Sequence, residues 1–269
     1  MNLKAESRKL EDQFKKLQAK GRMSFMETCI RQIYKSWILK DGYVGIDIGA
    51  HKGLHTFEMA DSVGPSGQIF AFEANPHLYL NLCSRLLPQN QVTLINAAVS
   101  DSNIDLVPFY LNPAHPGQST IVENYGNNFT KDYQINVPCV SIDSFLGDYL
   151  LQKRLAFVKI DAEGAELKIL KGMKQLLSNK YPLICAEISL YSWIKCRSVF
   201  DELLGSIDYA AFTLSGINIS ELTNAQIADL GSPAYTLVLA KKDHWSFDFA
   251  NNPAKMCSIV SNVVRNALE

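Results

Sequence analysis

Short runs of β-branched and aromatic residues alternate with segments of helical periodicity after Gly42, and this alternation constrains the fold more than any other feature. Runs of this kind, bounded by turn residues, predict strands. Strands that alternate with helices predict a parallel sheet covered by helices. The five expected strands lie at 43–49, 68–74, 92–99, 155–160 and 182–188. Two later runs, at 206–215 and 234–242, predict strands that pair at one edge of the sheet.

Three further regions flank or interrupt this pattern. Residues 1–40 predict a helical arm, because their apolar residues recur every three or four positions. The segment 104–140 is polar and contains several prolines and glycines, so it predicts an insertion of two strands joined by a long loop. The domain itself is expected to span 41–243, and a tail at 244–269 ends in an expected helix over 257–268.

Local signals set the expected helix boundaries. Asn75 followed by Pro76 predicts a capped helix start after the second strand. Asp143 is expected to cap a short helix after the insertion. One continuous helix is expected over 165–177, and another near 193–204.

The composition fits a globular protein with one sizeable core, since 47% of the 269 residues are hydrophobic. No apolar run approaches the roughly 18 residues of a membrane-spanning helix, and the first residues lack the apolar segment of a secretory signal. The six cysteines form no CxxC pair, which favours reduced thiols over a disulfide framework or a zinc ribbon. These features predict a cytoplasmic protein.

Charge is distributed unevenly along the chain. The net charge is −1, but residues 1–40 hold ten Lys or Arg against four acids, which leaves +6 on the arm and −7 on the remainder. The body is therefore mildly acidic, and we expect no nucleic-acid partner. The arm is expected to pack over the cleft or to pair with a second subunit in a homo-oligomer, and an anionic membrane is the less favoured partner.

The strongest chemical signal is the strand–turn–helix segment from Val44 to Gly53. Asp47 ends the strand, Gly49 and Gly53 permit a tight turn, and the next helix offers free N–H groups. The G-x-G-x-x-G spacing of a dinucleotide site is absent, and a carboxylate would repel a diphosphate. The segment therefore predicts a site for a cationic or hydroxyl-rich ligand and disfavours a nicotinamide dehydrogenase.

A second acid, Glu73, ends the next strand twenty residues after Gly53. From this place a carboxylate accepts hydrogen bonds from both hydroxyls of a ribose. Taken alone, Glu73 could be a solvated charge at a strand end. Together with the glycine turn, it predicts a nucleoside site.

Four motifs between about 42 and 190 carry a resemblance to a known family. They are DIGAHKG at 47–53, GPSGQIFAFEANP at 64–76, NAAVSD at 96–101 and VKIDAEGAE at 158–166. The chain resembles the FkbM family of S-adenosylmethionine-dependent methyltransferases. The resemblance implies a Rossmann-like α/β fold of the class I methyltransferase type, with a seven-stranded, mostly parallel sheet and a C-terminal antiparallel strand pair.

The resemblance also implies the cofactor contacts. The glycine turn surrounds the methionine part of S-adenosylmethionine, the acid after the second strand holds the ribose, and the segment after the third strand lines the adenine. The residues concerned are Asp47, Gly49, Ala50, His51, Gly53, Glu73, Asn96, Ala97 and Ala98. His51 stands where the commoner loop has a glycine, and Ala74 where a proline often follows the acid, but neither change removes a charged contact.

His55 and Thr56 open the helix after the turn. The Thr56 hydroxyl could hold the carboxylate of the methionine part, or it could be an ordinary helix-surface threonine. His55 could act as a base near neutral pH, although such a histidine is more often packed or solvated. His51 and His55 are four residues apart, but the turn at Gly53 separates them and disfavours a metal site.

Acidic side chains gather where the fourth and fifth strands end. Asp161 and Glu163 follow the fourth strand and Glu187 ends the fifth, so we expect them beside the methyl donor. A carboxylate whose pKa is raised by burial and by a neighbouring acid could serve as general base for a hydroxyl acceptor. Mg²⁺ held by the same acids is the less favoured alternative. Glu163 and Glu166 could also do no more than complement a helix dipole.

The sequence thus leads to one main hypothesis and one from another class. The main hypothesis is an O-methyltransferase acting on a hydroxyl of a small-molecule or glycan acceptor, with the loop at 112–120 placed to close over that acceptor. The alternative is a non-catalytic module that binds the cofactor and acts through its basic arm. The intact acids Asp161, Glu163 and Glu187 favour the enzyme.

Overall fold

The computed structural model describes residues 25–86, 89–123, 133–188, 190–214, 216–228 and 236–252, together with 255, 256, 258, 259 and 262. The first part of the arm and most of the expected C-terminal helix lie outside these residues, so the arm's partners stay a prediction. Among the helices of the described part, none combines the length and the apolar character needed to span a membrane.

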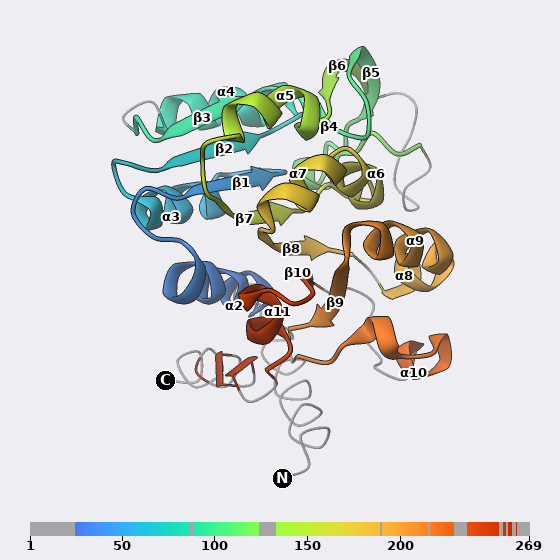
Figure 1. Ribbon diagram of the computed structural model, residues 1–269. Coiled ribbons are helices and arrows are strands. Elements are labelled where there is room, and N and C mark those ends of the chain that lie inside the picture. Colours follow the sequence, from blue (N-terminus) through green and yellow to red (C-terminus); the bar gives the residue numbers. More distant parts are fainter. Residues whose placement is uncertain are drawn as a thin grey trace.

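Seven strands form the main sheet of the molecule. They are β1 Val44–Ile48, β2 Gln68–Phe72, β3 Val92–Ile95, β7 Leu155–Ile160, β8 Leu183–Glu187, β9 Tyr209–Thr213 and β10 Thr236–Lys241. Their order in the sheet is β3-β2-β1-β7-β8-β10-β9 (Figure 1). The first five in this order run parallel, whereas β10 is antiparallel to both of its neighbours. The expected mostly parallel sheet with a C-terminal antiparallel pair is confirmed.

The centre of the sheet contains a topological switch point. From β1 the chain moves outward through β2 and β3, and it later returns to β7 on the other side of β1. Open α/β sheets bind ligands at the carboxyl ends of strands beside such a point. The register places Asp47 opposite Lys159 and Ile48 opposite Phe72. The residues that follow these strands therefore meet at one edge.

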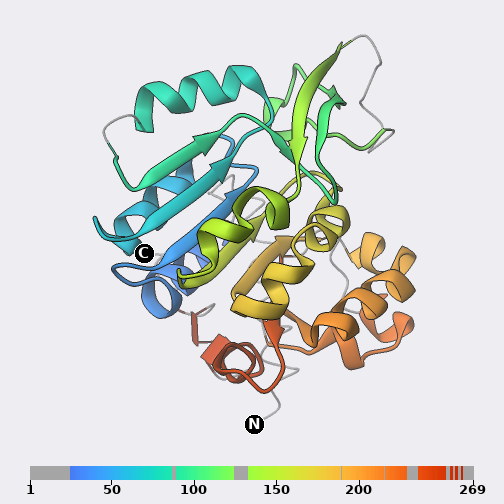
Figure 2. The ribbon, with the colours of Figure 1, turned by 45° about the horizontal axis from the view of Figure 1, so that its top comes forward.

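Helices cover both faces of the main sheet and create two hydrophobic layers. One layer is built by α2 (Phe25–Ile33), the π-helical turn η1 (Tyr34–Ile38), α3 (Leu54–Val63), α4 (Pro76–Leu86) and α11 (Trp245–Ala250). The other is built by α5 (Ile142–Leu150), α6 (Glu166–Lys171), α7 (Lys174–Lys180), α8 (Leu190–Lys195) and α9 (Arg197–Ile207). In Figure 2, α5 and α7 lie in front of the sheet and α3 lies behind it. Strand side chains alternate between the layers, so Phe157 packs in the first and Val158 in the second.

The insertion, together with the short strand before it, builds a second, three-stranded sheet beyond the carboxyl ends of β1 and β2 (Figure 1). It consists of β4 (Ala98–Val99), β5 (Ile104–Tyr110) and β6 (Gln134–Val140), in the order β4-β6-β5. The two strands expected in the insertion are thus confirmed. After β5 the chain turns back through the short η2 (Pro116–Gln118), and Thr120 forms a bridge with Tyr110. We call residues 111–121 the strap.

The cap expected at Asp143 is wrong. Ser141 is the N-cap of α5, and its hydroxyl accepts the N–H of Ser144. The Asp143 carboxylate instead accepts the N–H groups of Gln175 and Leu176, at 2.9 and 2.8 Å, in the first turn of α7. The residue type was right for a cap, but the helix that it caps begins about thirty residues later in the chain.

The single helix expected over 165–177 is also wrong, because it breaks into α6 and α7 at Gly172. The backbone of Gly172 runs against the backbone of Ser100, and a side chain here would overlap the Ser100 carbonyl. Close contact between two backbones therefore ends α6, and only glycine permits it. The helix expected near 193–204 likewise divides into α8 and α9, on either side of Cys196.

The expected start of α4 is confirmed. Asn75 and His77 stand on either side of Pro76, and the Asn75 side chain accepts the N–H of His77 at 3.0 Å. This cap fixes the direction in which the chain leaves the end of β2. It thereby fixes the place of Glu73, which lies between strand and helix.

Candidate active site

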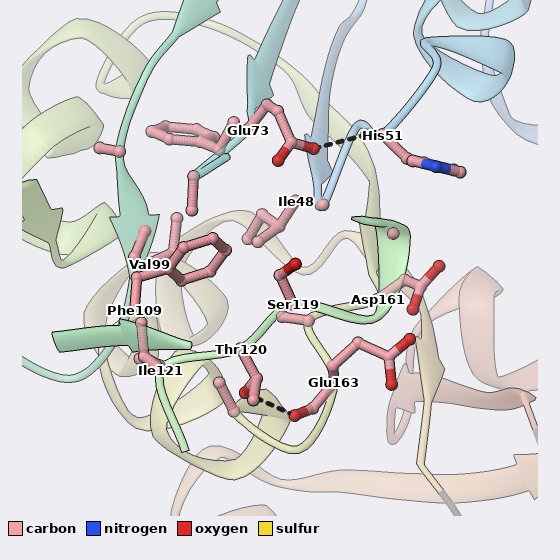
Figure 3. Close-up of a pocket in the computed structure, with 18 of the residues that line it drawn as sticks. Ile48, His51, Glu73, Val99, Phe109, Ser119, Thr120, Ile121, Asp161 and Glu163 are labelled. Carbon is pink, nitrogen blue, oxygen red and sulfur yellow. Dashed lines mark hydrogen bonds between the residues drawn. The ribbon is translucent and has the colours of Figure 1, made fainter. Parts of the chain in front are cut away.

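A cavity lies at the carboxyl edge of the main sheet, between the ends of β1, β2 and β7 on one side and the strap on the other (Figure 3). It holds about 630 Å³ of space outside the atoms, part of it open to solvent. Its apolar wall is made by Ile48, Phe72, Ala97, Ala98, Val99 and Phe109. Its charged wall consists of Glu73, Asp161 and Glu163, and no Lys or Arg of the described residues lines it.

The turn after β1 brings two backbones into contact. Gly49 has φ +83°, and a side chain there would overlap the carbonyl oxygen of Asp161. The N–H groups of Gly49 and Ala50 both donate to the Phe72 carbonyl at 3.0 Å. Glycine at position 49 thus lets the turn lie directly against the residue that follows β7.

Glu73 is held by two backbone N–H groups. Its Oε2 accepts the N–H of His51 at 2.7 Å (Figure 3). Its Oε1 accepts the N–H of Asn75 at 2.8 Å. Burial raises the pKa of Glu73, and these two N–H groups oppose the rise. Each carboxylate oxygen keeps further acceptor capacity, which suits a ligand with neighbouring hydroxyls.

Two strained residues lie on the wall of this cavity. His51 and Glu163 both have φ of 50°, a region that side chains rarely adopt. The other described non-glycine residues with positive φ are Tyr181 and Asp208, which close α7 and α9, and Asp243, after β10. Strain that no helix end explains is a sign of function when it gathers at one cavity.

His51 lines the cavity and its ring lies against the strap. A side chain at Gly117 would touch the His51 ring, with Nε2 at 2.8 Å. Burial and the charge of Lys52 lower the pKa of His51, so the ring is neutral near pH 7. The neutral ring leaves the cavity with net negative charge.

Glu163 lies opposite Glu73, and the strap holds its backbone. The Thr120 hydroxyl donates to the Glu163 carbonyl at 2.8 Å (Figure 3). Burial, followed by the charges of Asp161 and Glu187, raises the pKa of Glu163 to about 7. A carboxyl group with this pKa takes up or releases a proton near neutral pH.

Asp161 and Glu166, the other acids in the segment after β7, have different roles. Asp161 lines the cavity, but its carboxylate pairs with the Lys159 ammonium at 3.2 Å. Glu166 lies beneath the turn, where Oε1 accepts the N–H groups of Ala162 and Gly164 at 3.2 and 3.0 Å. Glu166 therefore stabilises the loop that carries Glu163.

Glu187 is at the end of β8 and does not line the cavity. Burial and the charge of Asp161 nevertheless raise its pKa to about 7. The negative charge of Glu187 acts on Glu163 from the neighbouring strand. The structure thus brings the three predicted acids to one edge of the sheet but only two of them to the cavity.

Three predicted site residues form a buried layer beneath the cavity instead of its wall. Asp47 has no exposed surface, and its Oδ2 accepts the Thr56 hydroxyl at 2.6 Å. His55 is buried beside Tyr34, with its Nδ1 at 3.3 Å from the Tyr34 hydroxyl. Burial and the charge of Lys159 lower the pKa of His55 to about 3, so the ring stays neutral.

The remaining predicted residues are divided between wall and support. Ala97 and Ala98 line the cavity, as expected for the segment after β3. Ala50 and Gly53 shape the turn, and Gly53, with φ +77°, is the N-cap of α3. The Asn96 side chain donates to the Glu73 carbonyl at 2.8 Å and thereby supports the acid.

Lys159 had no predicted role at the site, and Thr120 was predicted only as part of the loop at 112–120. Lys159 lies within β7. The signal for it in the sequence is one ionisable residue in the otherwise apolar run LAFVKI. Thr120 acts through its position in the folded strap, which no local pattern reveals. In the described part of the chain, no group of three His, Cys, Asp or Glu is placed to hold a metal ion.

The sequence-family model named methyltransferase FkbM domain matches residues 47–212 of this chain. Among solved structures, the FkbM methyltransferase of Methylobacillus flagellatus is similar at 15% identity with a TM-score of 0.45, over 77% of this chain and 49% of that one. This chain therefore spans about half the length of that protein. No curated protein matches the sequence.

Two further solved structures are similar to this chain. The precorrin-6y C5,15-methyltransferase of Geobacter metallireducens is 18% identical over 82% of this chain and 88% of its own, with a TM-score of 0.41. A SAM-dependent O-methyltransferase of Thermotoga maritima is 11% identical over 80% of this chain and 64% of its own, with a TM-score of 0.40. All three TM-scores are below 0.5, so the family assignment rests on the domain match.

The sheet order, the switch-point cavity and the domain match define the class as S-adenosylmethionine-dependent methyltransferases with a class I fold. The matched domain covers more than half of the 269 residues. The chain belongs to the FkbM methyltransferase family.

Proposed function

We propose that this protein is an O-methyltransferase that binds S-adenosylmethionine in the switch-point cavity and methylates a hydroxyl of a small-molecule or glycan acceptor. One observation carries the proposal. The cavity has three carboxylates and an apolar wall, and no Lys or Arg of the described residues lines it. A cationic nucleoside fits such a wall, whereas a phosphate-bearing cofactor would be repelled.

The residues present fit the parts of S-adenosylmethionine. Glu73, held by two backbone N–H groups, is placed to accept the ribose hydroxyls. The apolar wall beside Ala97 and Phe109 suits a flat adenine ring. The Gly49 turn lies directly against the backbone of Asp161, and both residues line the cavity where the methionine part is proposed to bind. The bound cofactor supplies a methyl group that its sulfonium activates for displacement.

Glu163 is the proposed general base. It lines the cavity, its pKa is raised to about 7, and the described residues give its carboxylate no hydrogen bond. It can accept the proton of an acceptor hydroxyl as the methyl group is transferred, which is worth about 10²–10⁴-fold in rate. Asp161, paired with Lys159, is the proposed residue that orients the acceptor. The proposed mechanism contains no step at His55.

The strap is the proposed cover of the site. Thr120 joins it to Glu163 and Gly117 lies on His51, so the strap crosses from one acidic part of the cavity to the other. A cover that excludes water strengthens the electrostatic interactions beneath it. Holding acceptor and methyl donor in line contributes about 7–11 kcal/mol to such a transfer.

Mass spectrometry with a deuterated methyl donor tests this function. The protein is incubated with the donor and with extracts that contain glycans and small metabolites, and products are searched for the added mass. We expect label on a hydroxyl oxygen of a neutral acceptor. Label on nitrogen or carbon only would contradict the O-methyltransferase. Calorimetric binding of adenosylhomocysteine without any labelled product would favour the non-catalytic binding module.

The same assay tests the less favoured role of Mg²⁺. Treatment with a chelator removes free divalent cations without altering the chain. We expect the labelling rate to stay unchanged, because a protein carboxylate takes up the proton in the proposed mechanism. A loss of labelling that added Mg²⁺ restores would favour a metal-assisted reaction.

A further inference from the structure

Lys159 is a buried cation in the middle of the main sheet. It lies on β7, all six residues of which are buried, and the register places it opposite Asp47 of β1. Its side chain reaches toward the carboxyl edge of the sheet. There the ammonium lies 3.2 Å from the Asp161 carboxylate, 3.4 Å from the Gly49 carbonyl and 3.7 Å from the Asp47 carboxylate.

These three partners belong to three different parts of the site. Gly49 forms the turn on the cofactor side, Asp161 lines the acceptor side, and Asp47 lies in the buried layer beneath both. An ammonium has three donors, so one group can bind all three partners at once. Lys159 is therefore the point at which the two sides of the site are joined.

The ammonium stays charged in spite of its burial. Burial alone would lower the pKa of Lys159, but the charges of Asp161 and Asp47 raise it above its ordinary value. A buried charge persists only when paired in this way. The site therefore contains a fixed positive charge at every working pH.

We propose that Lys159 is the positioning residue of this site, which holds the Gly49 turn and the Asp161 carboxylate in fixed relation and supplies the positive charge beneath the acidic wall. This inference rests on the proposed function, because it assigns Lys159 a role in the same methyl transfer. Lys159 does not line the cavity, so it acts through Asp161 and Glu163 and does not touch the acceptor itself.

Titratable groups face Lys159 from each element packed around it. They are Asp47 and His51 from β1 and its turn, His55 from α3, Glu73 from β2, Asp161 and Glu163 after β7, and Glu187 from β8. The charge of Lys159 lowers the pKa of both Glu163 and Glu187, against the effects of burial and of Asp161. Removal of the cation should therefore shift both titrations upward.

The test uses variants in which no buried charge is left unpaired. Lys159→Met alone would leave Asp47 buried without its cation, which destabilises a protein strongly. The comparison is therefore between Asp47→Asn and the double variant Asp47→Asn/Lys159→Met. Lys241→Met is the matched control, because Lys241 pairs with Asp208 at 2.8 Å at the end of β10, away from the cavity.

The readout is the pH titration of ¹³C-labelled Asp and Glu carboxyl groups by NMR, in protein without cofactor. We expect the Glu163 midpoint to rise by about one pH unit in the double variant relative to Asp47→Asn. It should not move in Lys241→Met. Equal midpoints in Asp47→Asn and the double variant, with a cooperative melting transition in both, would overturn the proposal.

A charge-conserving variant provides a second, independent measurement. Lys159→Arg keeps the positive charge but replaces a compact ammonium by a planar group of different shape. We expect at least a tenfold loss of kcat with little change in KM and an unchanged Glu163 midpoint. Full kcat in this variant would also overturn the positioning role. Failure of the wild type to bind adenosylhomocysteine would contradict the proposed function instead, since the NMR titration needs neither cofactor nor turnover.

Discussion

The two sides of the cavity present the same chemical group in different surroundings. On the cofactor side, Glu73 accepts two backbone N–H groups at 2.7 and 2.8 Å, which stabilise its charged form. On the acceptor side, the Glu163 carboxylate receives no hydrogen bond from the described residues, and burial beside Asp161 raises its pKa to about 7. The contrast separates a carboxylate built to bind from one built to exchange a proton.

The two sides also differ in what holds them. Glu73 is held by the N–H of Asn75, two positions later, and by the N–H of His51, 22 positions earlier, so all of these residues lie within the segment from β1 to the start of α4. Glu163 depends on contacts distant in sequence, since Thr120 of the strap holds its carbonyl across 43 positions. The cofactor side is therefore built within one strand–helix–strand unit, whereas the acceptor side also needs the strap, which lies farther away along the chain.

The largest expected difference between substitutions on the two sides is in the rate of methyl transfer. Glu163→Gln keeps the size of the side chain but removes the base, so we expect kcat to fall by about 10²–10⁴-fold. Affinity for adenosylhomocysteine should stay within about threefold of the wild type, because Glu163 does not hold the nucleoside. Methyl transfer assays and calorimetry measure the two quantities. Full activity in this variant would end the assignment of Glu163 as base.

The reciprocal change should act on binding. Glu73→Ala removes the ribose acceptor and leaves two backbone N–H groups without their partner, so we expect about tenfold to hundredfold weaker binding of adenosylhomocysteine. Glu221→Ala, at an exposed acid of η4 (Ile219–Glu221), is the matched control and should bind normally. An unaltered affinity in Glu73→Ala would contradict the ribose assignment.

A smaller effect should follow from loosening the acceptor side alone. Thr120→Val removes the hydroxyl that donates to the Glu163 carbonyl and keeps the shape of the side chain. The loss of one hydrogen bond of about 1 kcal/mol corresponds to a fall in kcat of about fivefold. Thr120→Ser retains the hydroxyl and should retain most of the rate. If both variants behave alike in steady-state assays, the bond to Glu163 has no role.

The smallest expected effect is on stability, and its sign follows from the raised pKa. The pKa of Glu163 is about 7 in the folded protein against 4.5 for the free group, so the folded state binds more protons between these values. Stability from this group is therefore present below about pH 4.5 and is lost as the pH rises through 7.

Glu163→Gln should accordingly melt about 2–4 °C higher than the wild type at pH 8, since its side chain cannot ionise. The gap should shrink at pH 5.5, where the wild-type carboxyl is protonated in the folded state. Calorimetric melting at the two pH values measures this. If the difference in melting temperature between Glu163→Gln and the wild type is the same at both pH values, Glu163 titrates as an ordinary exposed acid.

The difference in locality explains how much of the molecule could be predicted from its sequence. Strands β1, β2 and β7 and the turn at Gly49 carry their signals in adjacent residues, and the structure contains them as expected. Asn75 caps α4 for the same reason. Fold and cofactor side thus follow from short-range patterns.

The misplaced features depend on partners far along the chain. Asp143 caps α7 across 32 positions, and Gly172 ends α6 because the Ser100 backbone lies against it. Asp47 pairs with Lys159 beneath the cavity, a partner more than a hundred positions away, and its expected contact with the cofactor stays a prediction. A residue type indicates that a helix is capped, that two backbones lie close together or that a carboxylate has a partner. Only the packed structure shows which helix, backbone or cation that partner is.

The crystal structure of the protein with adenosylhomocysteine tests the central claim most directly. We expect the ligand in the switch-point cavity, with its ribose hydroxyls within hydrogen-bond distance of Glu73 and its sulfur facing the side of Asp161 and Glu163. A ligand bound elsewhere, or bound there with its ribose away from Glu73, would contradict the account.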